Sequence, residues 1–100
     1  MGIDQLKTNE ILKLCESSKV KSLFAFGSIT RDDFNDHSDI DLVVDFNEND
    51  PFKYTDLYFN LKRNLEAILK RQIDLIEARA IRNRIFRQEL ENSKVKIYES

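Results

Sequence analysis

Apolar residues recur along this chain with two spacings, one typical of strands and one typical of helices. Within residues 39–46, every second position carries one apolar face, and its members are Ile40, Leu42, Val44 and Phe46. The positions between them form the opposite face, and these are Asp39, Asp41, Val43 and Asp45. This alternation predicts a strand with one face buried in the core.

Two stretches have helical spacing. Residues 4–17 predict a helix whose core-facing side chains are Leu6, Ile11, Leu14 and Cys15. Asp50-Pro51 resembles an N-cap followed by a proline in the first turn, and it predicts the start of a second helix of about 15 to 18 residues. The apolar stripe of this second helix consists of Tyr54, Leu57, Tyr58, Leu61, Leu65, Ile68 and Leu69.

The remaining segments complete an α-β-β-α-β-α-β order. Short apolar strands are expected near residues 21–26, 72–76 and 94–98, and Asn83 can cap a helix that runs to about Glu91. This order predicts an α/β (α+β) fold in which helices pack mainly on one face of a small mixed sheet. No repeat, linker or low-complexity tract is visible, so residues 1–100 are expected to form one domain.

Composition fits a soluble domain. Of the 100 residues, 41% are hydrophobic and 34% are charged, which is enough apolar surface to form a core. No apolar run approaches the roughly 20 residues that cross a bilayer, and the N-terminus lacks a signal-peptide pattern, so a cytoplasmic protein without membrane contact is expected. Cys15 is the single cysteine and is expected to be a small buried hydrophobic residue.

The net charge of −2 disfavours broad, non-specific binding to nucleic acid, which depends on clustered cations. A local basic cluster remains, formed by Arg79, Arg82, Arg84 and Arg87. It fits either a solvated helix face or a contact with phosphate or a partner.

Gly27 is the only glycine in the interior of the sequence. It follows an apolar strand segment and is expected to open a turn or short helix, where the backbone turns sharply or approaches another group closely. Free backbone N–H groups and the Ser28 hydroxyl could hold phosphate oxygens there, and Arg31 could neutralise phosphate charge. A plain turn is the alternative.

Asp39 and Asp41 point the same way from an extended strand, about 6–7 Å apart along the backbone. Such a pair can bridge two magnesium ions about 4 Å apart, which also accept phosphate oxygens. The alternative is an ordinary strand whose acidic face meets water.

Asp74 interrupts the apolar run formed by Ile73, Leu75 and Ile76. An unpaired carboxylate would be costly in a covered strand, so Asp74 is expected to need a cation or hydrogen-bond donors. If its strand lies beside residues 39–46, Asp74 completes a three-carboxylate cluster as a metal ligand and as a candidate proton acceptor. The alternative is a strand end that exposes an acid.

The segment from Gly27 to Arg31, followed by Ser38-Asp39-Ile40-Asp41-Leu42, resembles the signature of the DNA polymerase beta-like nucleotidyltransferase superfamily. Residues 29–38 are the ten residues that separate Gly-Ser from Asp-x-Asp in that signature. The resemblance spans essentially the whole chain and is to the minimal nucleotidyltransferases (MNT), which are similar to the catalytic core of larger relatives.

This resemblance implies a function. It implies that Gly27, Ser28 and Arg31 hold the phosphates of ATP, and that Asp39, Asp41 and Asp74 bind Mg²⁺ and catalyse transfer of AMP to a protein hydroxyl. Many minimal nucleotidyltransferases are antitoxins that silence a HEPN ribonuclease toxin by attaching AMP to a tyrosine. A HEPN-family toxin is therefore the expected partner.

One residue departs from the family pattern. Asp32 stands where relatives often have glycine, and its charge would repel phosphate unless it faces solvent or pairs with Arg31. Catalysis, rather than fold, is what this residue puts in question. His37, the only histidine, is expected to be an exposed loop residue without a role in the mechanism.

Two other functions stay open at this point. The chain could be a non-catalytic antitoxin that neutralises its partner by occlusion, or a small-molecule nucleotidyltransferase that needs a helper domain or a dimer partner. Phe52 and Phe59 project away from the apolar stripe and fit either a partner contact or other core space. The oligomeric state, including a homo-oligomer, is not determined by the sequence.

Overall fold

A computed structural model describes residues 2–31, 34–35 and 37–100. The helical elements are the 3₁₀ segments η1 (Ile3–Leu6), η2 (Gly27–Thr30) and η3 (Ala78–Ala80), and the helices α1 (Asn9–Ser17), α2 (Pro51–Leu69) and α3 (Arg84–Ser93). The strands are β1 (Val20–Phe26), β2 (Ile40–Phe46), β3 (Ile73–Glu77) and β4 (Val95–Glu99). The predicted order of helices and strands is confirmed.

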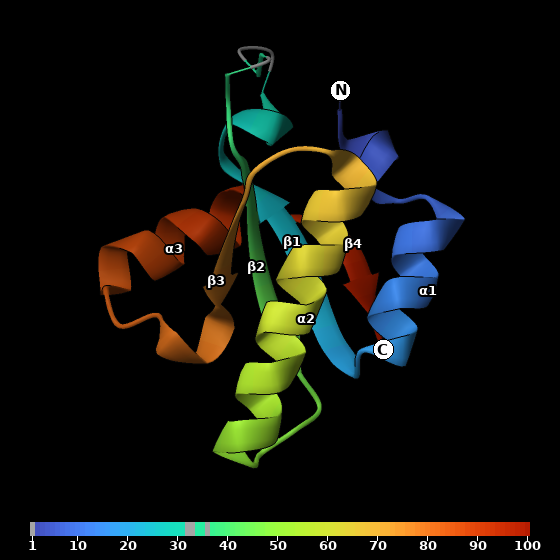
Figure 1. Cartoon of the computed structure of the whole chain (residues 1–100). Helices are drawn as coiled ribbons and strands as arrows, with labels where there is room; N and C mark the ends of the chain where they lie inside the picture. Colours follow the sequence, from blue (N-terminus) through green and yellow to red (C-terminus); the bar gives the residue numbers. More distant parts are fainter. Residues whose placement is uncertain (1, 32–33, 36) are drawn as a thin grey trace.

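The strands form one mixed sheet in the order β3-β2-β1-β4 (Figure 1). β1 pairs antiparallel with β2 and β4, whereas β2 and β3 are parallel. Because β2 and β3 are parallel, both begin at the same end of the sheet, and α2 returns the chain to that end between them (Figure 1). β1 ends there as well, since it runs antiparallel to β2.

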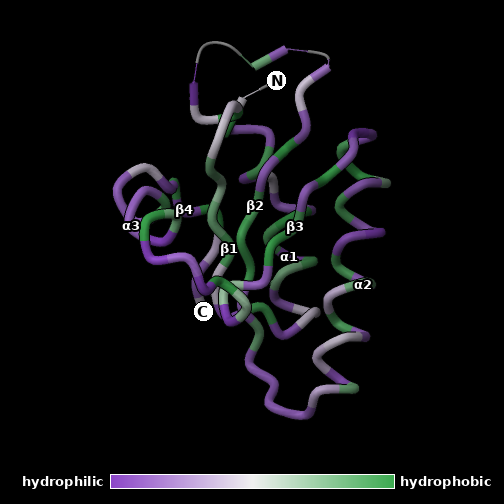
Figure 2. The backbone as a smooth tube through the Cα atoms, turned by 90° about the vertical axis from the view of Figure 1, so that its left-hand side faces the viewer, coloured by the Kyte–Doolittle hydropathy of each residue, from purple (hydrophilic) through white to green (hydrophobic). Residues whose placement is uncertain are grey.

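Helices lie on both faces of the sheet. Seen along the sheet in Figure 2, α1 and α2 lie on one side and α3 on the other. The predicted fold class, a mixed sheet with helices mainly on one face, is therefore confirmed, with α3 as the helix on the second face. No helix in the described part of the chain is both long and apolar enough to span a membrane.

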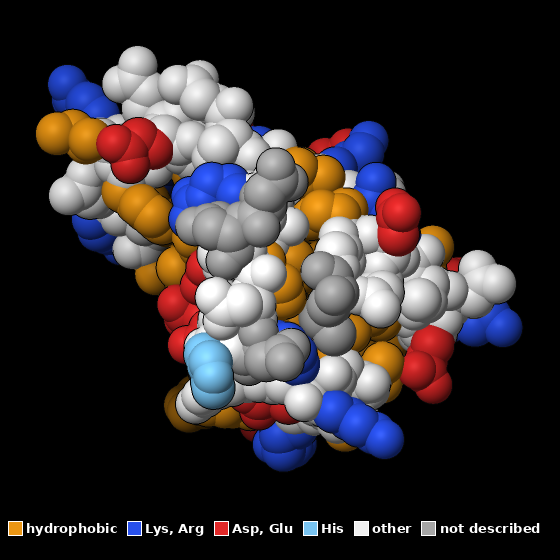
Figure 3. Space-filling view, turned by 90° about the horizontal axis from the view of Figure 1, so that it is seen from above, with side chains coloured by type: hydrophobic (Ala, Val, Ile, Leu, Met, Phe, Trp, Pro, Cys, Tyr) orange, Lys and Arg blue, Asp and Glu red, His pale blue; other side chains and the backbone are white. Residues whose placement is uncertain are grey.

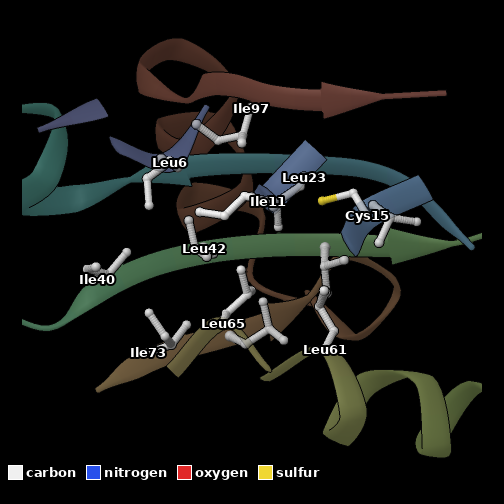
Figure 4. Packing of buried hydrophobic residues seen from close by; sticks show 14 of the residues in the cluster. Leu6, Ile11, Cys15, Leu23, Ile40, Leu42, Leu61, Leu65, Ile73 and Ile97 are labelled. Carbon is white, nitrogen blue, oxygen red and sulfur yellow. The ribbon is translucent and has the colours of Figure 1, made fainter. Parts of the chain in front are cut away.

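The main core lies between the sheet and the pair α1 and α2 (Figure 4). The alternation predicted for residues 39–46 is confirmed, because Ile40, Leu42, Val44 and Phe46 are all buried on this side. Leu61 and Leu65 of α2 pack against them. A smaller cluster on the other face joins Val43 to Ile81 and Leu90. β2 thus carries Asp41 and Val43 on the sheet face that lies toward α3.

The first predicted helix differs from the structure. Residues 4–17 form η1 and then α1, with a break at residues 7–8. Thr8 explains the break, because its hydroxyl accepts a hydrogen bond from the Ile11 backbone N–H at 3.4 Å and caps the start of α1. Leu6 and Ile11 are nevertheless both buried, as the pattern predicted.

The four arginines do not share one helix face, which was the first of the two alternatives for this cluster. Arg79 lies in η3, before α3 begins, and its guanidinium holds the far ends of β2 and β3 together. It bonds Asp45 Oδ1 at 2.8 Å and the carbonyls of Phe46 and Glu48 at 2.6 and 2.7 Å. Arg82 and Arg87 also donate to backbone carbonyls, those of Arg79 and Ile81. Three of the four are therefore engaged within the fold.

Cys15 is fully buried, as expected, and burial raises the pKa of its thiol from 9.0 to about 11. We predict that the folded protein resists alkylation by iodoacetamide at pH 8. At that pH a rise of about two pKa units lowers the thiolate fraction about 100-fold, and burial lowers access further. The measurement compares labelling rates in buffer and in denaturing urea.

The control is a Cys15→Ala/Glu16→Cys variant, which moves the thiol to an exposed neighbouring position of α1. This variant should react at nearly the same rate folded and unfolded. Equal labelling of the folded and unfolded native sequence would contradict the burial of Cys15.

Candidate active site

Three chain segments of the predicted signature meet at one end of the sheet, where β1 ends and β2 and β3 begin (Figure 1). Gly27 follows β1 directly, Asp39 precedes β2, and Asp74 is the second residue of β3. The segments are far apart in sequence, and strand pairing alone brings them together.

Asp41 and Asp74 are direct partners in the parallel pairing of β2 with β3. The two side chains are close enough to share a proton, and this proximity helps to raise the pKa of the Asp41 carboxyl. Asp39 lies just before β2 and is close enough for its charge to act on the Asp41 carboxyl. The sequence-based prediction that the strand of Asp74 lies beside residues 39–46 is confirmed.

The environment of Asp41 reflects this crowding of acids. Burial, followed by the charges of Asp74 and Asp39, raises the pKa of the Asp41 carboxyl, while Arg31 acts in the opposite direction. Burial and like charges both oppose ionisation, so a cation bound here would relieve both effects.

Gly27 touches Asp41, and this contact explains why the chain has a glycine there. The Gly27 φ angle is +73°, in the left-handed region that glycine favours. A Cβ at this position would also lie 2.4 Å from Asp41 Oδ2. Close approach and backbone conformation therefore both exclude a side chain, and the predicted turn after β1 is confirmed.

The turn itself is η2. Its Thr30 hydroxyl donates to the Gly27 carbonyl at 2.6 Å, and the Arg31 N–H donates to the Ser28 carbonyl at 3.0 Å. Arg31 is close enough to Asp41 for its charge to act on that carboxylate. The structure thus brings Arg31 and the Gly27-Ser28 turn to the acidic group.

One expectation about Asp74 is corrected. Its side chain is exposed and not covered, so the cost of burying an unpaired carboxylate does not explain its presence in β3. The alternation of the strand is the reason, because Ile73 and Leu75 face the core and Asp74 faces away from it. What makes Asp74 unusual is its neighbour Asp41 rather than its burial.

The acidic group fits magnesium only in part. Among the described residues, no three Asp, Glu, His or Cys side chains are arranged to hold one metal ion by themselves. Two carboxylates in contact nevertheless match the usual way in which Mg²⁺ is held, by one or two carboxylates together with substrate phosphates. The residues therefore suit an ion that arrives with a nucleotide.

Charges of both signs mix around this end of the molecule. Figure 3 looks down on it and shows Lys and Arg side chains scattered among acidic and apolar ones, not gathered into one basic field. His37 is exposed in a turn, as expected. Asp32, the departure from the family pattern, lies outside the described residues.

Two residues near the site were missed by sequence reasoning. Phe26 pairs with Asp41 across β1 and β2, and its ring meets Phe86 of α3 edge-on, with centroids 5.9 Å apart. For Phe26, its position directly before Gly27 is the feature of the sequence that could have pointed to the site. Arg71 donates to backbone carbonyls 33 and 36 residues earlier, and no local pattern could indicate such a contact.

Comparison with known proteins decides the family. The sequence model of the family described as "Polymerase beta, Nucleotidyltransferase" matches residues 9–100. The chain belongs to the polymerase beta nucleotidyltransferase family. The resemblance inferred from the Gly-Ser and Asp-x-Asp signature is confirmed, and so is the expectation that the protein is a nucleotidyltransferase.

Relatives of this nucleotidyltransferase include MJ1379 from Methanocaldococcus jannaschii, provisionally named a protein adenylyltransferase. It is 36% identical over 89 residues, which are 89% of this chain and 86% of the relative. A solved structure provisionally described as a minimal nucleotidyltransferase has a TM-score of 0.76 at 25% identity and covers 95% of both chains.

A third similarity extends to a complex. A chain in the structure of a tri-AMPylated Shewanella oneidensis HEPN toxin with its MNT antitoxin matches with a TM-score of 0.63 at 22% identity. The match covers 96% of this chain and 72% of that one. At this identity the likeness establishes a shared fold.

We predict that Gly27→Ala lowers nucleotide binding and the free energy of unfolding together. An alanine at φ +73° costs roughly 1–2 kcal/mol, and its Cβ would push the Asp41 carboxylate aside. Calorimetric titration with a non-hydrolysable ATP analogue and urea denaturation measure the two effects. Gly2→Ala is the matched control, because a Cβ there meets nothing within 4 Å. If Gly27→Ala bound the nucleotide as tightly as the wild type, the turn at Gly27 would not be part of a nucleotide site.

Proposed function

We propose that this nucleotidyltransferase transfers AMP from ATP, with Mg²⁺, to a hydroxyl group of a protein partner. We further propose that the partner is a HEPN-family toxin and that the protein acts as its antitoxin. The observation that carries the proposal is the side-by-side placement of Asp41 and Asp74, with Asp41 directly against the backbone of Gly27.

Two relatives support the choice of acceptor. MJ1379 carries the name of a protein adenylyltransferase and aligns with nearly the whole chain. The fold is also shared with a chain from a complex in which the HEPN toxin is AMPylated. Both relatives point to a protein acceptor in preference to a small molecule.

The phosphates of ATP are assigned to the turn that follows β1. In this assignment the backbone N–H groups of Gly27 and Ser28, together with the Ser28 hydroxyl, would be the donors. Arg31 supplies the positive charge that offsets the triphosphate. Because Gly27 has no side chain, a phosphate can approach both the backbone and the acidic group.

Asp39, Asp41 and Asp74 would hold Mg²⁺ that enters with the nucleotide. When bound, the ion would polarise the phosphate oxygens and neutralise the charge that develops on them. Asp41 is the central ligand in this assignment, since its carboxyl contacts Asp74 and senses Asp39. Asp39 is exposed at the start of β2, where it can turn toward the nucleotide.

The transfer step forms a bond between the acceptor oxygen and the α-phosphorus of ATP. The bond from the α-phosphorus to the bridging oxygen breaks, and pyrophosphate leaves in line with the attack. Asp74 accepts the proton of the acceptor hydroxyl. Its exposure suits this role, because a hydroxyl on another protein must reach the carboxylate from solvent.

We predict that the wild type transfers label from ATP carrying radioactive α-phosphate to a co-purified HEPN partner when Mg²⁺ is present. Asp39→Ala/Asp41→Ala should lower the transfer rate by at least ~100-fold, because loss of the metal ligands removes several kcal/mol of transition-state stabilisation. Labelled partner is measured on a denaturing gel. Glu16→Ala is the control, since Glu16 is an exposed acid on α1, away from both the acidic group and the groove along α2.

No labelling by the wild type, or undiminished labelling by the double variant, would exclude the proposed reaction. A separate result would favour the alternative function, in which the protein neutralises the toxin by occlusion without catalysis. If the Asp39, Asp41 and Asp74 triple alanine variant still neutralised the toxin fully in cells, occlusion would be sufficient and catalysis would not explain the antitoxin effect.

The partner contact is assigned to the outer face of α2. Phe52 and Phe59 project from it with side chains 85% and 51% exposed, as the helical spacing predicted. Phe59 also lines an open groove of about 640 Å³, which includes Lys53 and Leu57. Exposed aromatic side chains beside a groove are typical anchors of protein interfaces. This face is opposite to that of Asp41, so a partner bound here must reach around the sheet to present its hydroxyl.

We predict that Phe59→Asp weakens the complex with the HEPN partner by about 10-fold or more, because a central aromatic contact typically contributes above 1.4 kcal/mol. Surface plasmon resonance or titration calorimetry measures the affinity. Ala67→Asp introduces the same charge at an exposed position of α2 outside this groove and should leave the affinity nearly unchanged. Equal affinities for wild type and Phe59→Asp would remove this face from the interface.

A further inference from the structure

One side chain ties the start of β2 to the start of β3. Arg71 lies between α2 and β3, and its Nη2 donates to the carbonyl oxygens of Ser38 at 2.5 Å and Asn35 at 2.7 Å. The Ser38 carbonyl belongs to the peptide bond that leads directly into Asp39. Arg71 therefore binds the backbone at Ser38, the residue directly before Asp39.

The guanidinium is fixed on a second side by an aromatic ring. Its central carbon lies 4.6 Å from the centre of the Phe34 ring, and Phe34 packs against the main core. A planar guanidinium can stack on a ring and donate in its own plane at the same time, which a lysine ammonium cannot reproduce. The contact thus depends on arginine in particular.

The two residues that Arg71 holds are also hydrogen-bonded to each other. The Asn35 N–H donates to Ser38 Oγ at 3.2 Å, and the Ser38 N–H donates to the Asn35 carbonyl at 3.1 Å. Two residues after Ser38, the Ile40 N–H donates to the Gln72 carbonyl at 3.2 Å and continues the pairing of β2 with β3. The bonds of Arg71 and of Gln72 are therefore adjacent, on either side of Asp39.

We propose that Arg71 is a positioning residue of the transfer site, which sets the place of Asp39 relative to Asp41 and Asp74 by holding the peptide before Asp39. This inference rests on the proposed function. Asp41 and Asp74 are fixed within paired strands, whereas Asp39 precedes β2 and is exposed. Asp39 is thus the acid whose position depends most on an anchor outside the strand ladder.

The expected cost of losing the anchor is catalytic. Residues that orient a metal ligand through its surroundings typically change metal affinity or activity by about 10- to 100-fold when they are replaced. A displacement of about 1 Å can itself lower a rate by about 100-fold. The phosphate-binding turn at Gly27 belongs to another segment, so ATP binding should change much less than the rate.

The test compares Arg71→Met, Arg71→Lys and the control Arg63→Met, which replaces an exposed arginine of α2. Hydrogen exchange measures the backbone amides of Ser38 and Ile40, and electron paramagnetic resonance measures Mn²⁺ affinity with a non-hydrolysable ATP analogue. Steady-state transfer separates kcat from KM.

For Arg71→Met we expect faster exchange at Ser38 and Ile40, about 10-fold weaker Mn²⁺ binding and a kcat about 100-fold lower with KM for ATP near wild type. Arg71→Lys keeps the charge and should restore only part of each loss. Exchange in α1 and β1 should stay at the wild-type rate in both variants, as it should for Arg63→Met.

Exchange and Mn²⁺ affinity equal to those of Arg63→Met would overturn the inference, and so would full rescue by lysine. If Arg71→Met does not fold, Arg71→Lys decides by the same measurements. A wild type that transfers no label refutes the proposed function, and exchange at Ser38 and Ile40 then decides separately whether Arg71 anchors this segment.

Discussion

Two carboxylates held side by side repel each other, and the parallel register of β2 and β3 forces Asp41 and Asp74 into this position. The fold cannot relieve the repulsion by turning the strands, because Ile40, Leu42 and Ile73 are buried on the opposite face. Packing on one side of the sheet therefore maintains an unfavourable arrangement of charge on the other. Burial against α1 and α2 is therefore what keeps Asp41 and Asp74 side by side.

The elements of the fold followed from periodicity, because each strand and helix contains its own apolar pattern. The structure differs from the sequence-based predictions where a single polar side chain determines the local structure. Thr8 starts a new helix by capping it, which an apolar pattern running through residues 4–17 does not reveal. The arginines after β3 are bound to carbonyls that only tertiary structure brings near them, as Arg79 shows with Glu48 and Phe46.

The sequence indicated which residues form the site, but it did not indicate the physical reasons why several of them lie there. Gly27 was singled out by its rarity, and the structure supplies the reason, a left-handed turn pressed against Asp41. Asp74 was chosen on the assumption of burial, yet it is exposed and owes its place to strand alternation. The contact of Arg71 with Ser38 spans 33 residues and left no trace in local sequence. Local patterns thus identify what the strands carry, whereas the connections between strand ends need coordinates.

The close approach of Gly27 to Asp41 joins two strands as well as two residues. Phe26 and Asp41 are paired between β1 and β2, so Gly27 meets that carboxylate only when this antiparallel register is correct. A slip by one residue would turn Asp41 into the core and Leu42 out of it. Faulty strand alignment would therefore remove nucleotide chemistry and core packing in the same event. For the proposed reaction, turnover would therefore also report that β1 and β2 are paired in the correct register.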